Sequence, residues 1–170
     1  MASPDLTITT PEITDGATMW RIAEEVGLDP NSPYKYLIFC RDFADSSAVA
    51  RSGNEVVGFV TGYRRPTAPD TLFVWQVGVL SSQRGKGVAG AMLDYLTGTG
   101  EAAGAGPHNH HVPKVAHLEA TVTPDNQNSM KLFTRFGKRR DAQVQKTVLL
   151  PSDVFPEPHA EEILLRIGPF

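Results

Sequence analysis

Cysteine, net positive charge and long apolar runs are all scarce in this chain, and each scarcity excludes a class of protein. The single cysteine, Cys40, excludes a disulfide or cysteine-metal scaffold within one chain, and its place in an apolar run favours core packing over a nucleophilic role. The formal net charge of -3 provides no field that would attract nucleic acid. No apolar stretch reaches the roughly eighteen residues of a membrane span, and no signal peptide is indicated, so we expect a cytoplasmic protein.

What is present is typical of one globular domain. The 170 residues are 41% apolar and 21% charged, which is enough for one sizeable core and short for two. We therefore predict a single domain over residues 1–170, with a flexible, glycine-rich insert at 98–113. His108, His110 and His111 lie in this insert between glycines and prolines, where no rigid element fixes a metal's geometry, so we assign no metal.

An apolar strand that runs into a glycine-rich turn and then a helix is the most informative feature of the chain. Residues 71–79 (TLFVWQVGV) precede the turn at 83–89 (QRGKGVA). Glycines let backbone N–H groups approach a ligand, and the helix N-terminus carries a partial positive charge. The junction therefore suits a phosphate or pyrophosphate, although a tight turn without a ligand is the alternative on these residues alone.

The spacing of the glycines excludes two common nucleotide motifs. A P-loop needs a lysine and then serine or threonine after its last glycine, whereas Gly87 is followed by Val88 and Ala89. A dinucleotide fingerprint needs three glycines in another rhythm and an acidic residue about twenty positions further on. Residues 84–89 instead resemble the turn of the GNAT-type N-acetyltransferases that holds the pyrophosphate of acetyl-CoA.

Hydrophobic periodicity predicts the order β-α-α-β-β-β-α-β-α-β-β along the chain. The second helix places Tyr34, Leu37, Ile38 and Arg41 on one side, and residues 65–70 are expected to form a loop because two prolines cannot sit inside a central ladder. The element order predicts an α/β (α+β mixed) fold, with a central mixed sheet of six to seven strands and about four helices on both faces. It is also the order of the GNAT fold.

Four longer blocks make the resemblance specific. Residues 28–37 (LDPNSPYKYL), 68–77 (APDTLFVWQV), 118–127 (LEATVTPDNQ) and 159–168 (HAEEILLRIG) resemble, in this order, the L-2,4-diaminobutyrate acetyltransferases of ectoine biosynthesis. The resemblance covers nearly the whole chain. It implies transfer of acetyl from acetyl-CoA to the 4-amino group of L-2,4-diaminobutyrate by a homodimer.

The resemblance also implies a substrate pocket. Diaminobutyrate carries two ammonium groups, which acidic side chains must recognise, and Asp29 and Glu162 are the acidic residues in the matching blocks. The other implied pocket residues are Ser32, Tyr34, Trp75 and His159, and Tyr34 is also a candidate catalytic residue. Taken alone, Asp29 could be only a turn residue, Ser32 only a helix cap and Trp75 only core.

Catalysis needs a group that removes the proton of the amine and donors for the thioester oxygen. Glu119 shares a strand face with His117 and Thr121 and is the candidate base, while an exposed strand carboxylate is the alternative. The donors are expected from backbone N–H groups at 77–79, on a strand that splays from its neighbour. The full cofactor set is Val77, Gly78, Val79, Arg84, Gly85, Lys86, Gly87, Val88, Ala89 and Asn126.

The general acid is left open, because Phe133 stands where many GNAT enzymes have a tyrosine that protonates the departing thiolate. Two other functions also stay open. One is a GNAT acetyltransferase for another diamine or basic amino acid, and the other is a non-catalytic acyl-CoA-binding module. The tail block argues against the module, because cofactor binding alone has no need of His159 and Glu162.

Overall fold

The computed structural model describes residues 6–29, 31–99 and 113–170. Most of the insert predicted at 98–113, with its three histidines, lies outside these residues. The elements follow the predicted order: β1 (Leu6–Thr9), α1 (Gly16–Glu25), α2 (Pro33–Asp42), β2 (Ala48–Ser52), β3 (Glu55–Arg65), β4 (Ala68–Val79), α3 (Val88–Thr97), β5 (His117–Val122), α4 (Gln127–Lys138), β6 (Val144–Leu150) and β7 (Glu162–Ile167).

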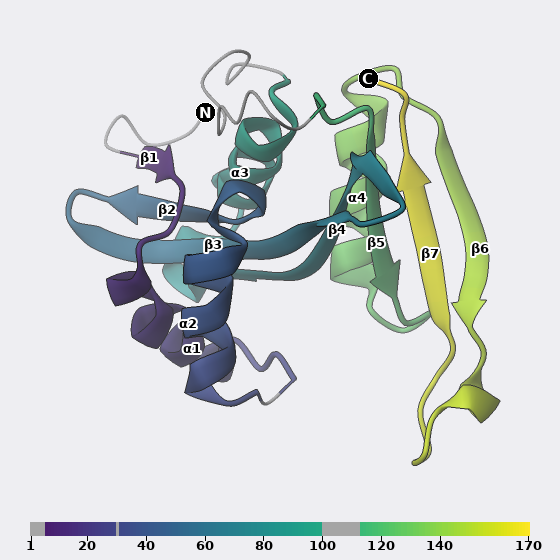
Figure 1. Cartoon of the computed structure of the whole chain (residues 1–170), viewed down its shortest axis with the longest axis horizontal. Coiled ribbons are helices and arrows are strands. Elements are labelled where there is room, and N and C mark those ends of the chain that lie inside the picture. Colours follow the sequence, from purple (N-terminus) through teal and green to yellow (C-terminus); the bar gives the residue numbers. More distant parts are fainter. Residues whose placement is uncertain (1–5, 30, 100–112) are drawn as a thin grey trace.

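The seven strands form one sheet in the order β1-β2-β3-β4-β5-β7-β6 (Figure 1). Neighbouring strands are antiparallel except β4 and β5, which are parallel. Two hairpins, β2–β3 and β3–β4, precede the crossover through α3 that makes this parallel pair. The predicted mixed sheet is therefore confirmed.

Helices cover both faces of the sheet (Figure 1). On one face α1 and α2 form a cluster with β2 and β3, made of Met19, Ile22, Ala23, Tyr36, Cys40, Val49 and Phe59. On the other face α3 and α4 bury Val88, Met92, Leu93, Leu96, Phe133 and Phe136 against the strands. Each helix thus contributes an apolar stripe at helical spacing, which is what fixes it to the sheet.

The expectation of a loop at 65–70 is wrong. Strand β3 runs to Arg65 and β4 begins at Ala68, so only two residues turn the chain. The register of β3 against β4 shifts between Arg64, which pairs with Leu72, and Arg65, which pairs with Ala68. This irregularity accommodates Pro69 within the strand, because its missing N–H falls where the ladder is already interrupted.

The side of α2 that carries Tyr34 and Leu37 is not its buried side. Tyr34 is 69% exposed and Leu37 is 36% exposed, whereas Tyr36 and Cys40, one turn apart, are buried against α1. The first turn of α2 therefore presents Tyr34 to solvent. The structure confirms that Cys40 is a core residue, 4% exposed.

Cys40 is expected to be chemically inert in the native protein. Burial raises the pKa of its thiol to about 11, so the reactive thiolate is nearly absent at pH 8. Ellman's reagent should leave the folded protein unmodified and titrate one thiol per chain after denaturation in guanidinium chloride. Rapid labelling of the native chain would contradict this burial. If Cys40 is not labelled, the thiol that Ellman's reagent detects in an activity assay comes from CoA alone.

Strands β4 and β5 separate half-way along β4. Their parallel pairing runs from Thr71 opposite His117 to Val74 opposite Ala120, whereas β4 continues to Val79. At the same point β4 has a β-bulge opposite β3. Gly62 pairs with Val74 and Thr61 pairs with Gln76, so Trp75 has no partner on β3. The predicted splay is confirmed, and it opens a wedge in the middle of the sheet.

Candidate active site

A cavity of about 300 Å³ occupies the wedge between β4 and β5. Its walls come from β4 at 74–77, from β5 and the residues after it at 120–123, and from the α1–α2 loop at 27–29. The first turns of α4 and the segment that leads into β7 complete it. Five segments that are distant in sequence therefore meet where the sheet opens.

Four of the predicted substrate residues line this cavity together: Asp29, Trp75, His159 and Glu162. Val77 and Asn126, predicted for the cofactor, line it as well. Ser32 and Tyr34 are not among the lining residues. Ser32 is the N-cap of α2, although its side chain makes no capping hydrogen bond there.

His159 and Glu162 form a pair at the entrance to β7. His159 Nδ1 lies 2.5 Å from the carbonyl oxygen of Ala160, to which it donates, and Nε2 lies 3.8 Å from Glu162 Oε1. Phe155 stacks on the imidazole with ring centroids 4.0 Å apart. The imidazole is therefore oriented from two sides, and the Glu162 side chain is only 18% exposed.

Trp75 is held by α2. Phe39 stacks on it with ring centroids 5.2 Å apart, and Lys35 Nζ lies 4.4 Å from the centre of its ring. The face of an indole attracts cations through its quadrupole, which favours the position of Lys35 over this ring.

Glu119 is neither an exposed carboxylate nor a residue that lines the cavity. Its side chain is 5% exposed, with Oε1 2.5 Å from Arg166 Nη1 and Oε2 3.4 Å from Arg65 Nη1. Two guanidinium groups therefore occupy both of its oxygens. The alternative of a solvent-exposed strand carboxylate is wrong, and the ion pairs join β5 to β7 and to the end of β3.

A second cavity, of about 620 Å³, lies between α3 and α4. The predicted cofactor residues that line it are Val79, Arg84, Gly85, Gly87, Val88 and Ala89. Lys86 instead donates to Gln83 Oε1 at 3.1 Å on the surface, and Gly78 is covered by Phe59. A Cβ at Gly78 would lie 2.6 Å from Phe59 Cε1, so this glycine serves close packing rather than the cavity.

The glycine turn exposes the start of α3 to this second cavity. Gly85 and Gly87 have φ of +76° and +79°, a backbone conformation that other residues rarely adopt. Gly87 is the N-cap of α3, and no side chain caps the helix. The first N–H groups of this ten-residue helix are thus available to an anion in the cavity.

The basic face of α4 is a feature that sequence reasoning missed. Lys131, Arg135, Lys138 and Arg139 line the same cavity as Arg84, and no carboxylate is among the described lining residues. Their spacing of i, i+4, i+7 and i+8 places them on one side of a helix. This spacing could have predicted a basic face on the helix. The apolar residues of the same helix form a more regular pattern, so the helix was interpreted from its buried side alone.

The two cavities are lined by neighbouring residues of β4 and α4. Val77 of β4 and Phe133 of α4 line the first cavity, and Val79 of β4 and Leu132 of α4 line the second. Leu80 N–H donates to Val57 on β3, and the Val79 carbonyl accepts from Arg84 Nε at 3.4 Å. By strand alternation, the backbone groups of Val77 and Val79 face away from β3 and toward the opening.

Comparison with known proteins identifies this arrangement. Residues 16–138 match the Acetyltransferase (GNAT) family. The chain belongs to this family. The match runs from the start of α1 to the end of α4, and therefore contains both the glycine turn and the bulged strand. The predicted GNAT fold is confirmed.

Within this family, the acetyltransferase is similar over most of its length to proteins named L-2,4-diaminobutyric acid acetyltransferase. It is 47% identical to the L-2,4-diaminobutyric acid acetyltransferase of Streptomyces coelicolor, over 99% of this chain and 95% of the relative. It is 42% identical to that of Marinococcus halophilus, over 94% of this chain and 88% of the relative. The resemblance found in the four sequence blocks is thereby confirmed.

A solved structure agrees with these relatives. The diaminobutyrate acetyltransferase EctA from Paenibacillus lautus, in complex with its substrate L-2,4-diaminobutyric acid and coenzyme A, superposes on this acetyltransferase with a TM-score of 0.83. The two are 35% identical, over 98% of this chain and 96% of the other. The ribosomal-protein-S18-alanine N-acetyltransferase from Escherichia coli shares the fold at a TM-score of 0.68 and 16% identity.

The part of the acetyltransferase that the structure describes contains no group of three or more histidine, cysteine or acidic residues placed to hold a metal ion. His108, His110 and His111 lie outside it. Within the same residues, no helix is long and apolar enough to cross a membrane.

Proposed function

We propose that this acetyltransferase transfers acetyl from acetyl-CoA to the 4-amino group of L-2,4-diaminobutyrate, which gives N4-acetyl-L-2,4-diaminobutyrate in ectoine biosynthesis. The observation that carries the proposal is the cavity in the β4–β5 wedge, which brings Asp29 and Glu162 together from opposite ends of the chain. A small diamine needs two fixed anions, and this cavity supplies them beside the path between the two cavities.

The cofactor would lie with its phosphates in the second cavity. The N–H groups at the start of α3 suit the pyrophosphate, and the cations of α4 neutralise the phosphate charges. The pantetheine arm extends along β4 from Val79 to Val77, a step of about 7 Å at the rise of a strand. The thioester then reaches the first cavity, where backbone N–H groups of β4 that face the opening can stabilise the developing oxyanion.

The acceptor amine must lose a proton before it attacks the thioester carbonyl. We assign this proton to His159, which lines the cavity with Nε2 beside Glu162, rather than to Glu119, whose oxygens are held by arginines. The neutral amine then forms the new C–N bond, and the C–S bond breaks. Phe133 lines the cavity without a hydroxyl that could protonate the leaving group, so the CoA thiolate takes up the second amine proton, which the nitrogen releases as the C–S bond breaks.

A panel of acceptors tests the function. Thiol release from acetyl-CoA would be measured with diaminobutyrate, ornithine, lysine and spermidine, and the acetylated position determined by NMR. We expect the highest kcat/KM with diaminobutyrate and acetylation at N4, because a longer side chain carries its amine past the thioester. A preference for another acceptor would leave a GNAT enzyme of different specificity, and no turnover with any of them would favour the binding module.

The oligomeric state and location are part of the proposal. We infer a homodimer, supported by the exposed apolar side chains of Val148, Leu149 and Leu150 on β6, a strand at the edge of the sheet. The cytoplasmic location stays a prediction from the sequence.

Replacing Gly87 by aspartate should weaken CoA binding by up to about thirtyfold. The new carboxylate would oppose a helix-terminus interaction with phosphate that is worth up to about 2 kcal/mol. Calorimetric titration with CoA measures the effect. Gly87→Asn is the matched control, because it carries the same cost of a positive φ without the charge. If both variants bind CoA equally, the start of α3 does not hold the phosphates.

A further inference from the structure

The proposed acceptor carries one charge that the acidic residues of the cavity do not satisfy. Diaminobutyrate has a carboxylate besides its two ammonium groups, and Asp29 and Glu162 would repel it. No lysine or arginine is among the described residues that line the cavity. A carboxylate bound there therefore needs neutral hydrogen-bond donors of fixed orientation.

Gln76 is a lining residue with such an orientation. It lies on β4 next to the Trp75 bulge and is 8% exposed. Tyr36 donates its hydroxyl to Gln76 Oε1 at 2.8 Å across the interface between α2 and β4. With Oε1 engaged as the acceptor, the amide must present its nitrogen, Nε2, in the other direction.

The nitrogen of this amide has no hydrogen-bond partner among the residues that the structure describes. No hydrogen bond from Gln76 Nε2 is formed with any residue in the described ranges, and Nε2 is not among the fully buried unpaired atoms. It is therefore open to the cavity that Gln76 lines. A nearly buried amide that keeps two free N–H groups is a ready donor for an anion.

Tyr36 is fixed firmly enough to orient the amide. It is fully buried and packs edge-on against Phe59, with ring centroids 5.8 Å apart and an interplanar angle of 88°. Burial also raises the pKa of the Tyr36 hydroxyl, so it stays protonated and keeps its role as a donor.

We propose that Gln76 selects an amino-acid acceptor over a simple diamine, by donating its Nε2 hydrogens to the substrate carboxylate, with Tyr36 as the positioning residue. The inference rests on the proposed function and adds the part of the substrate that the acidic residues leave unexplained. Lys35 is a cation that contacts the Trp75 ring, but it does not line the cavity. Its ammonium lies over Trp75 and donates to Asn31 Oδ1 at 2.7 Å.

The test compares diaminobutyrate with 1,3-diaminopropane, which has the same separation of amines without the carboxylate. Gln76→Met removes the donors at nearly equal size, and kcat/KM for diaminobutyrate should fall about tenfold to a hundredfold. The value for 1,3-diaminopropane should change by less than about threefold, since that molecule never used the donors. If the diamine turns over too slowly, its inhibition constant against diaminobutyrate replaces kcat/KM.

Two further variants keep the test independent of a folding defect. Gln76→Glu should lower activity on diaminobutyrate further and improve the diamine, because the new charge repels a carboxylate and attracts a dication. Tyr36→Phe leaves the donors in place but frees the amide to rotate, so it should lose part of the discrimination. Gln145→Met, an exposed glutamine on β6, is the matched control and should match the wild type on both substrates.

The outcomes separate this inference from the proposed function. Equal losses on both substrates, or no loss on either, would show that Gln76 only shapes the cavity and would overturn the inference. It is also overturned if Lys35→Met, and not Gln76→Met, removes the discrimination. A wild-type enzyme that fails to acetylate diaminobutyrate refutes the proposed function instead.

Discussion

Replacing Glu162 by glutamine is expected to lower kcat/KM for diaminobutyrate by about one to two orders of magnitude, and Asp29→Asn should have an effect of similar size. A hydrogen bond from an ammonium to a carboxylate is worth roughly 1.5–3 kcal/mol, and each decade of rate corresponds to about 1.4 kcal/mol. Both residues line the β4–β5 cavity, whereas the cations that suit the cofactor line the other cavity. Affinity for CoA should therefore change little.

Steady-state kinetics with diaminobutyrate and a separate titration with CoA measure the two effects. Glu161→Gln is the matched control for Glu162, because it removes the neighbouring charge from a residue outside the lining of the cavity. Asp153→Asn serves the same purpose for Asp29 on an exposed segment. If Glu162→Gln and Asp29→Asn both keep the wild-type kcat/KM, or if their defect lies mainly in CoA binding, the acidic cavity is not the substrate site.

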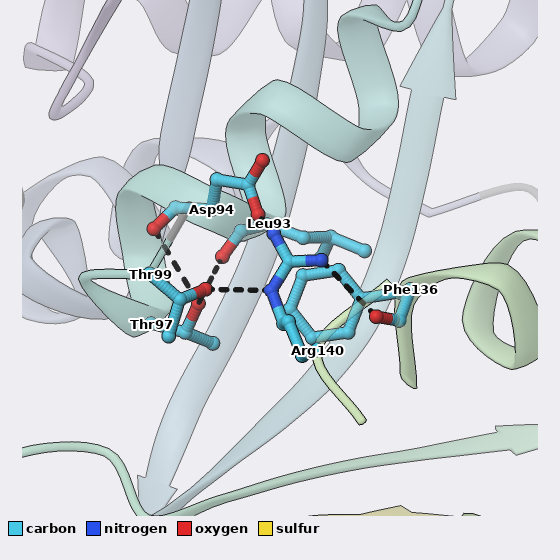
Figure 2. A network of polar contacts seen from close by, with 6 residues as sticks. All are labelled: Leu93, Asp94, Thr97, Thr99, Phe136 and Arg140. Atoms are coloured by element: carbon cyan, nitrogen blue, oxygen red, sulfur yellow. Dashed lines mark hydrogen bonds and ion pairs between the residues drawn. The ribbon is translucent and has the colours of Figure 1, made fainter. Parts of the chain in front are cut away.

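Arg140→Met is expected to lower the free energy of unfolding by about 3 kcal/mol, because it leaves a buried carboxylate without its partner. Arg140 follows α4 and forms an ion pair with Asp94 of α3, and the two side chains are only 10% and 14% exposed. Its Nε donates to Thr99 Oγ1 at 2.8 Å and its Nη1 to the Phe136 carbonyl at 3.1 Å (Figure 2). The guanidinium also lies over the Phe136 ring, 3.8 Å from its centre.

Urea denaturation measures the change. Arg21→Met, at an exposed position of α1, is the control and should alter the free energy of unfolding by less than about 0.5 kcal/mol. The double variant Asp94→Leu, Arg140→Met should lose less than Arg140→Met alone, because no unpaired charge remains buried. A loss below about 1 kcal/mol for Arg140→Met would show that the pair does not clamp α3 to α4.

Features set by a few adjacent residues were predictable. The glycines at 85 and 87 adopt positive φ as their turn requires, and Asn126 caps α4 by accepting from Ser129 N–H at 3.1 Å. The order of helices and strands was equally readable, since alternation and helical spacing are local patterns. The resemblance of four blocks then pointed to Asp29, Trp75 and Glu162, which the fold brings into one cavity.

The sequence by itself determined the order of the elements, the glycine turn and the family, because each depends on residues close together in the chain or on a pattern shared with relatives. It did not determine where β3 ends and β4 begins, since the strands extend over the prolines expected to form a loop at 65–70. Only the tertiary structure decided the surroundings of the charged groups. Glu119 is buried because Arg65 and Arg166 arrive from two other strands, and Gln76 has a fixed amide because Tyr36 reaches it from α2. The burial and the hydrogen-bond partners of a polar side chain depend on segments far away in sequence, and no local pattern encodes which of them will pack against it.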